Sequence, residues 1–142
     1  VAALIADLQS ALPLIWGRAV VSVFFGGGTP SLLSPGAIEE LIAAFRALAM
    51  LSPEAEITLE ANPGTVETEK FAGFRAAGVN RLSLGIQSFN PRHLQALGRI
   101  HDDREARFAV ELALRNLEGV QFVFHVVVSS LRTRPSLGYD GQ

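Results

Sequence analysis

The sequence predicts an α/β fold in which parallel strands and helical crossovers form part of a (βα)-barrel. Strand-length apolar runs alternate with helix-length amphipathic stretches along the chain, which is typical of parallel strands joined by right-handed crossovers. Two of the expected strands alternate aliphatic with polar residues, as expected when polar side chains line a wide barrel lumen. Four expected strands are too few to close a barrel, so we predict a barrel arc. A flavodoxin-like open sheet is the alternative fold.

Most expected elements begin or end at a recognisable signal. Pro13 is expected to end the first helix, and Gly26 follows the first strand. Ser34 before Pro35 predicts a helix N-cap with proline at the first helical position. Gly78 is expected just past the end of a later helix. The expected elements are, in order, a helix over 2–12, a strand over 20–25, a helix over 35–51, a strand over 56–62, a helix over 65–77, a strand over 79–89, a short helix from 90, a helix over 103–117 and a strand over 120–128.

Polar residues gather at the ends of the second and third expected strands. The stretches 57–62 and 82–87 alternate aliphatic with polar residues, so each strand has one apolar and one polar face. Glu60 and Gln87 lie on the polar faces where these strands end. Because ligands bind at the carboxyl ends of parallel strands, we expect both residues at the same end of the sheet as residues 26–28.

Composition excludes several classes of function. The net charge is −2 with no basic block, so neither a nucleic acid partner nor binding to an anionic membrane surface is expected. No apolar run approaches the roughly 18 residues that cross a bilayer, so no integral membrane segment is expected. The chain has no cysteine, which excludes disulfides and thiolate-held metal sites within it and fits a reducing cytoplasm. Three dispersed histidines predict no metal site, and no catalytic residue is predicted.

Four features are candidates for ligand binding. Three glycines at 26–28 precede Thr29 directly after a strand, and they let a ligand approach the backbone closely. Glu60 could accept hydrogen bonds from ribose hydroxyls, and the Gln87 amide can both donate and accept. Arg99 could pair with a ligand carboxylate through its planar guanidinium. Each feature alone also has an ordinary interpretation, as a flexible turn, a solvated acid, a lumen-facing amide or a surface arginine.

Four sequence blocks together resemble radical S-adenosylmethionine proteins related to oxygen-independent coproporphyrinogen III oxidase. The blocks occur in the family's order and with family-like spacing, and the resemblance covers roughly residues 4–117. Residues 62–64 and 87–90 are more similar to the heme-chaperone branch of this family than to the true oxidase. The blocks are FFGGGTPSLL (24–33), TLEANPGT (58–65), NRLSLGIQSFN (80–90) and LGRIH (97–101).

The resemblance implies a cofactor and partners. In the family, a [4Fe–4S] cluster reductively cleaves S-adenosylmethionine to give a 5′-deoxyadenosyl radical. The heme-chaperone branch handles heme, so heme or a porphyrin and heme-accepting proteins are the implied partners. The implied contacts to S-adenosylmethionine are Gly27, Gly28 and Thr29 at its methionine end, Glu60 at its ribose, and Gln87 and Arg99 in the rest of the pocket.

The chain departs from the family pattern at both ends. The family's three-cysteine cluster motif belongs ahead of the first helix, and the chain starts after it. We therefore divide the chain into a partial radical S-adenosylmethionine core over 1–119 and a divergent strand and tail over 120–142. The leading hypothesis is an incomplete domain of heme-chaperone type, inactive alone because it has no cluster cysteines. The alternatives are a fragment of oxygen-independent coproporphyrinogen III oxidase and a non-catalytic remnant or interaction domain.

Overall fold

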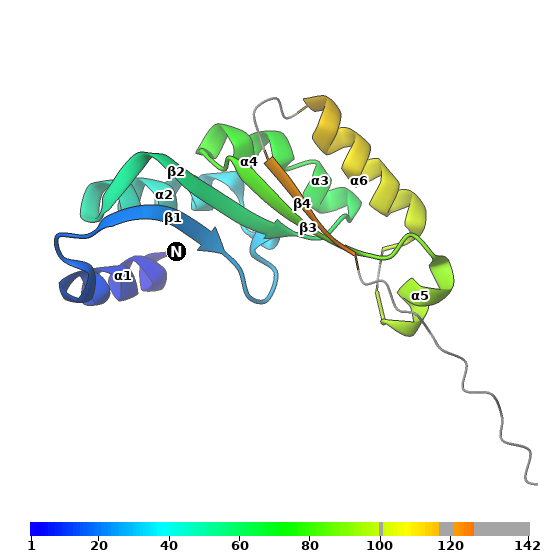
Figure 1. Cartoon of the computed structure of the whole chain (residues 1–142), viewed down its shortest axis with the longest axis horizontal. Coiled ribbons are helices and arrows are strands. Elements are labelled where there is room, and N and C mark those ends of the chain that lie inside the picture. Colours follow the sequence, from blue (N-terminus) through cyan, green and yellow to red (C-terminus); the bar gives the residue numbers. More distant parts are fainter. Residues whose placement is uncertain (100, 117–120, 127–142) are drawn as a thin grey trace, which may run out of the picture.

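Four parallel strands form a sheet in the order β1-β2-β3-β4, which is also their order along the chain (Figure 1). The computed structural model describes residues 1–99, 101–116 and 121–126. Each neighbouring pair of strands is parallel, so the predicted α/β class is confirmed. The strands are β1 (Ala19–Phe25), β2 (Met50–Ala61), β3 (Arg81–Gln87) and β4 (Gln121–Val126).

The strand order distinguishes the two folds that the sequence left open. A flavodoxin-like sheet reverses its direction of winding, which gives the strand order 2-1-3-4-5. In a (βα)-barrel, each strand instead pairs with the next strand along the chain after an intervening helix. The observed order 1-2-3-4 therefore fits an arc of a barrel.

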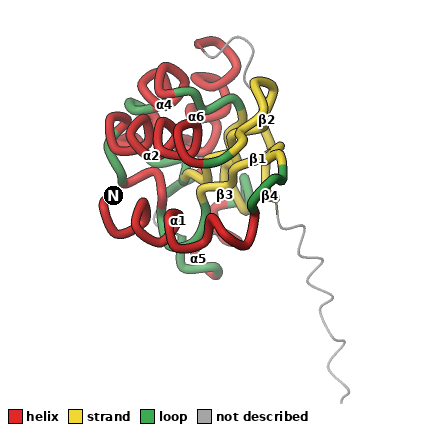
Figure 2. The backbone as a smooth tube through the Cα atoms, turned by 90° about the vertical axis from the view of Figure 1, so that its left-hand side faces the viewer, coloured by secondary structure: helices red, strands yellow, loops and turns green. Residues whose placement is uncertain are grey.

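Helices connect the strands, and α2, α4 and α6 lie together on one side of the sheet (Figure 2). Among the described residues, no helix combines the length and hydropathy that crossing a lipid bilayer requires. Ser34 caps α2 as predicted, because its Oγ accepts a hydrogen bond from the Ala37 amide at 3.1 Å. The helices are α1 (Ala2–Ile15), α2 (Pro35–Leu48), α3 (Thr65–Thr68), α4 (Phe71–Ala77), α5 (Pro91–Ala96) and α6 (Asp103–Asn116), with a 3₁₀ turn η1 (Pro30–Leu32).

The hydrophobic core lies between the sheet and these helices. The aliphatic residues of the alternating pattern on β2 and β3 are all buried, and they pack against Ile38 and Ile42 of α2 and Phe71 and Phe74 of α4. The predicted apolar faces are therefore confirmed, and the polar residues between them point to the opposite face. The core residues on the two strands are Ile57, Leu59, Ala61, Leu82, Leu84 and Ile86.

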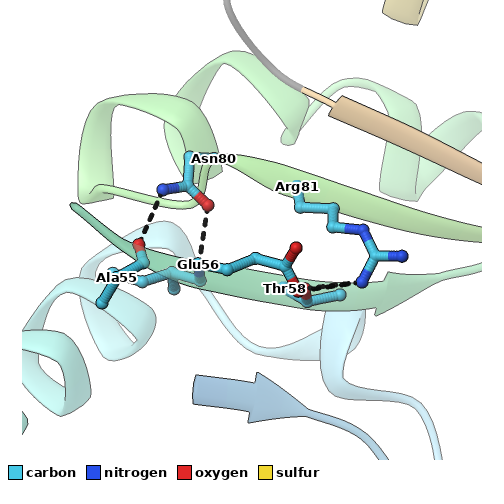
Figure 3. Close-up of polar contacts among 6 residues, drawn as sticks. Ala55, Glu56, Thr58, Asn80 and Arg81 are labelled. Carbon is cyan, nitrogen blue, oxygen red and sulfur yellow. Dashed lines mark hydrogen bonds and ion pairs between the residues drawn. The ribbon is translucent and has the colours of Figure 1, made fainter. Parts of the chain in front are cut away.

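Polar side chains join β2 to the start of β3 (Figure 3). The Arg81 guanidinium donates to Glu56 Oε1 at 2.9 Å on the polar face of the sheet. Asn80 extends the pairing of the strands, because its Oδ1 accepts from the Ile57 amide at 2.7 Å and its Nδ2 donates to the Ala55 carbonyl at 2.9 Å. The amino end of β3 is thus fixed to β2 by side chains as well as by the backbone ladder.

β2 is longer than predicted, because it begins at Met50 and not at residue 56. Its first residues pair with the start of β1, and pairing resumes at Glu56 after a register shift. Residues 52–55 lie in this irregular stretch, so Pro53 can occupy the strand without removing a ladder hydrogen bond. The early start of β2 also takes up residues predicted for α2, which ends at Leu48.

Two further helix predictions need correction. α1 continues to Ile15, because Pro13 lies in its last turn, where the missing N–H removes a single helical hydrogen bond. The helix predicted over 65–77 is divided into α3 and α4. Lys70 lies at the division, and its ammonium donates to two backbone carbonyls of η1 at 3.2 and 3.1 Å. The polypeptide turns at this contact, which ties α4 to the segment after β1.

Candidate functional site

The glycine loop, residues 26–30, leaves the carboxyl end of β1 in a conformation that favours glycine. Gly27 and Gly28 have φ values of 81° and 58°, where any other residue is strained. A Cβ added at Gly26 would collide with the Phe24 ring and approach Glu60 Oε2 to 3.2 Å. A Cβ at Gly27 or Gly28 would meet no atom of the described structure within 4 Å. Backbone conformation and close packing both require glycine here, and the loop borders open space.

Glu60 lies beside the glycine loop at the carboxyl end of β2. Its Oε2 accepts a hydrogen bond from the Gly27 amide at 3.3 Å, which ties the loop to the second strand. The side chain is half-buried, and no hydrogen bond joins its Oε1 to another described residue. Because an ionised carboxylate has about four acceptor sites, most of this capacity remains for donors on a ligand.

Gln87 ends β3 in a strained backbone conformation. Its φ is 66°, and it is the one non-glycine residue with a positive φ in the described part of the chain. The Ser88 amide donates to the Ile86 carbonyl at 2.8 Å, so Gln87 is the central residue of a positive-φ γ-turn, a rare type. Such conformations cost about 1–3 kcal/mol and cluster at functional sites. The β3–β4 register is also irregular between Leu84 and Gln87, which is typical of a strand bent to direct a side chain.

Arg99 approaches the same end of the sheet from the loop after α5. Gly98 has a φ of 64° and interrupts the helix as predicted. The Arg99 amide donates to the carbonyl of Leu94, a buried residue of α5, at 3.0 Å. The backbone at Arg99 is therefore anchored, while its side chain is exposed and free to turn toward a ligand.

One polar pocket of about 180 Å³ joins these features. The expected meeting of Glu60 and Gln87 at one end of the sheet is confirmed, whereas their role in binding stays a prediction. Of the predicted residues, Gly27 does not line this pocket. Its amide donates a hydrogen bond to Glu60, which does line the pocket. The predicted residues on the wall are Gly28, Thr29, Glu60, Gln87 and Arg99.

Three further residues on the polar face of the strands line the wall and were not predicted as site residues. Asn62, Ser83 and Gly85 line the pocket. A signal for them was present, because the alternating pattern placed them on the same face as Glu60 and Gln87. Gly85 has no side chain to occupy the pocket beside Gln87. A Cβ at this position would lie 3.8 Å from Gln87 Nε2, in van der Waals contact.

A second polar pocket of about 230 Å³ adjoins the first. Asn62 and Arg99 belong to both walls, and Glu67 and His101 also line the second pocket. The two pockets therefore share part of their walls.

A larger pocket of about 610 Å³ lies between α1, β1 and α2, and its walls are mainly apolar. The helix α1, which forms one of its walls, has no buried residue. Gly27 and Thr29 line it, whereas Glu60, Gln87 and Arg99 do not. A binding site needs converging polar groups that orient a ligand, so the smaller polar pocket is the better candidate.

His101 is buried, which its position in the sequence did not indicate. Its Nε2 lies 3.0 Å from the Ile86 carbonyl, one residue before the strained Gln87. The sequence indicated only that His101 precedes a helix, and no local pattern marks a side chain that reaches back to a strand. Within the described residues, no group of three or more histidine, aspartate or glutamate side chains could hold a metal ion.

Comparison with known proteins places this geometry in a family. The family model of the Radical SAM superfamily matches residues 8–129. The chain is 50% identical over 110 residues to the heme chaperone HemW of Escherichia coli, covering 78% of this chain and 29% of that protein. It is 52% identical over 108 residues to the heme chaperone HemW of Haemophilus influenzae, covering 76% and 28%. The chain thus spans less than a third of the length of these curated relatives.

A solved structure gives the same assignment. The coproporphyrinogen III oxidase HemN of Escherichia coli, a radical SAM enzyme, superposes with a TM-score of 0.75 at 30% sequence identity. The superposition covers 88% of this chain and 29% of that enzyme. Both the sequence match and the shared arc of parallel strands lead to one conclusion: the chain belongs to the radical S-adenosylmethionine superfamily.

Proposed function

We propose that this chain binds S-adenosylmethionine in the polar pocket at the carboxyl end of the sheet. The observation that carries the proposal is the convergence of an open glycine loop, a carboxylate with free acceptor sites and a strained glutamine around one space. Superfamily membership supplies the identity of the ligand. The proposed contacts are Gly27, Gly28, Thr29, Glu60, Gln87 and Arg99.

The chemistry of the pocket fits the polar groups of this cofactor. The backbone of the glycine loop and Thr29 can contact the amino acid end, where no side chain obstructs the approach at Gly28. The free acceptor sites of Glu60 suit the ribose hydroxyls. The Arg99 guanidinium can pair with the carboxylate of the methionine end through two parallel hydrogen bonds. Gln87 has both donor and acceptor atoms, so it can bridge these two parts of the ligand.

The residues of this chain do not fit an iron–sulfur cluster. Members of the superfamily cleave S-adenosylmethionine reductively with such a cluster, whose protein ligands are cysteine thiolates. The sequence contains no cysteine. The proposal for this chain is therefore limited to binding and orienting the cofactor, and no step is assigned to the cluster.

For the whole protein we propose heme handling of the HemW type, in the cytoplasm, with heme and heme-accepting proteins as partners. The support is 50–52% identity to proteins named heme chaperone HemW, against 30% to the oxidase HemN. The second candidate is coproporphyrinogen III oxidation, because the oxidase HemN shares this fold with a TM-score of 0.75 at 30% identity.

Heme binding without oxidase activity is the expected result for the full reading frame that contains this sequence. The reconstituted protein would be titrated with hemin in a spectrophotometer and incubated anaerobically with coproporphyrinogen III, S-adenosylmethionine and a reductant. A saturable heme spectrum with no protoporphyrinogen supports the chaperone assignment. Turnover of coproporphyrinogen III would reverse it in favour of the oxidase.

Replacing Glu60 with glutamine is expected to weaken S-adenosylmethionine binding about tenfold, because a neutral amide replaces a charged acceptor of nearly equal size. Isothermal titration calorimetry of the purified chain measures the change. Glu69→Gln is the matched control, since Glu69 is exposed and lies on neither pocket wall. Its affinity should equal that of the unmodified chain. Absence of binding by the unmodified chain would contradict the proposed function itself.

A further inference from the structure

The Ile86 carbonyl accepts two hydrogen bonds that arrive from different parts of the chain. The Ser88 amide donates to it at 2.8 Å and closes the γ-turn around Gln87. His101 Nε2 lies 3.0 Å from the same oxygen, and both the histidine and Ile86 are buried. A carbonyl oxygen is an acceptor only, so Nε2 carries the proton in this contact. The histidine therefore fixes the peptide whose orientation sets the direction of the Gln87 side chain.

His101 is itself firmly held by the start of α6. Asp102 Oδ1 accepts from the Arg104 and Glu105 amides at 2.9 and 2.8 Å, and Glu105 Oε2 accepts from the Asp102 amide at 3.1 Å. This reciprocal capping box begins the helix immediately after the histidine. The small residues Ala106, Ala109 and Ala113 of α6 are buried, and Ala106 and Ala113 belong to the hydrophobic core together with residues of β2 and β3. The imidazole is thus presented to β3 from a rigid support.

The same histidine lies close to Arg99 in the chain and in the structure. Arg99 is two residues earlier in the chain, and its amide is tied on the other side to the Leu94 carbonyl at 3.0 Å. His101 and Arg99 both line the second polar pocket. One buried hydrogen bond therefore links the segment that carries Arg99 to the strand end that carries Gln87.

We propose that His101 is a positioning residue for cofactor binding. Its hydrogen bond to the Ile86 carbonyl holds the strained turn at Gln87 and the Arg99 segment in the arrangement that binds S-adenosylmethionine. This inference rests on the proposed function for its ligand, but its structural part can be tested without one. The contrasting interpretation is that His101 only fills space in the core, in which case its donor atom is dispensable for binding.

Two substitutions separate these interpretations. His101→Gln places an amide N–H near the position of Nε2, and His101→Leu keeps similar bulk without a donor. We expect the His101→Gln variant to bind S-adenosylmethionine with an affinity within about threefold of that of the unmodified chain. The His101→Leu variant should bind about tenfold more weakly, which corresponds to the free energy of one buried hydrogen bond. Gln9→Leu is the control, because Gln9 is exposed on α1 and lies on neither pocket wall, and it should leave the affinity unchanged. If His101→Leu fails to fold, His101→Asn replaces it, since its shorter amide cannot reach the carbonyl.

A double-mutant cycle identifies the route of the effect. In a Gln87→Ala background, His101→Leu should cause less than its tenfold loss, because one of the two side chains that it positions is gone. An undiminished loss in that background would overturn the proposal, as would a leucine variant that melts at a lower temperature but keeps its affinity.

Amide hydrogen exchange tests the proposal when binding itself is absent. If the unmodified chain does not bind S-adenosylmethionine, the proposed function fails, and the exchange rate of the Ser88 amide becomes the readout. His101→Leu should speed this exchange at least about tenfold relative to His101→Gln, because the γ-turn loses its anchor. Equal exchange in the two variants would show that His101 does not hold the turn.

Discussion

Phe74→Ala is expected to lower the free energy of unfolding by about 3–5 kcal/mol. Phe74 lies in α4 with 0% of its surface exposed, and it packs against the sheet in the hydrophobic core. Alanine would leave a cavity there in addition to removing buried apolar surface. Urea denaturation followed by circular dichroism gives a midpoint and a slope for each protein. The free energies of unfolding of the variant and the unmodified chain are calculated from these values and compared.

The chain offers a matched control for this substitution. Phe108 lies on α6 with 52% of its surface exposed, so Phe108→Ala removes the same atoms from a site that is already partly hydrated. We expect a loss below about 1 kcal/mol for that variant, which is usual for surface positions. Comparable losses for the two phenylalanines would contradict the assignment of Phe74 to the core.

Gln87→Gly is expected to stabilise the fold and to weaken cofactor binding. Glycine adopts a positive φ without strain, so relief of the Gln87 conformation should raise the free energy of unfolding by about 1 kcal/mol. Loss of the amide should weaken S-adenosylmethionine binding by about ten- to thirtyfold, the cost of a lost hydrogen bond and an unpaired ligand atom. Denaturation and calorimetry on the same protein measure both changes.

Gln9→Gly makes the same chemical change where no strain exists. Gln9 is exposed in the middle of α1, so glycine there should lower the free energy of unfolding by roughly 0.5–1 kcal/mol. Its affinity for S-adenosylmethionine should not change. The Gln87→Gly substitution should therefore raise the free energy of unfolding, and the Gln9→Gly substitution should lower it. A destabilised Gln87→Gly variant would show that the turn is not strained.

Period-two alternation made the sheet and much of the site predictable. The pattern over 57–62 and 82–87 was strong enough to separate core from pocket residues, and it put Glu60 and Gln87 at one end of the sheet. The glycine loop was predictable for a similar reason, because few conformations other than a close turn use three consecutive glycines. These signals are local, and local sequence patterns report them well.

Features that depend on distant contacts were not predictable. The division between α3 and α4 lies where Lys70 donates to backbone carbonyls of η1, more than thirty positions earlier in the chain. The early start of β2 depends on a register shift against β1 that accommodates Pro53. The burial of His101 depends on a contact with a carbonyl fifteen positions away, and the γ-turn that contains Gln87 closes on the same carbonyl. Tertiary context overrode local propensity in each case.

The sequential strand order also has a consequence for how the sheet can form. Ala19 pairs with Met50, Thr58 with Arg81 and Arg81 with Gln121, so every described pairing closes a loop of modest length between consecutive strands. Loop-closure entropy grows only slowly with loop length, so its cost is similar for the three pairings, and no strand must enter between two that are already paired. During synthesis the sheet can therefore grow in chain order. The contact between the glycine loop and Glu60 uses only the first two strands, so this half of the pocket can assemble before Gln87 and Arg99 have left the ribosome.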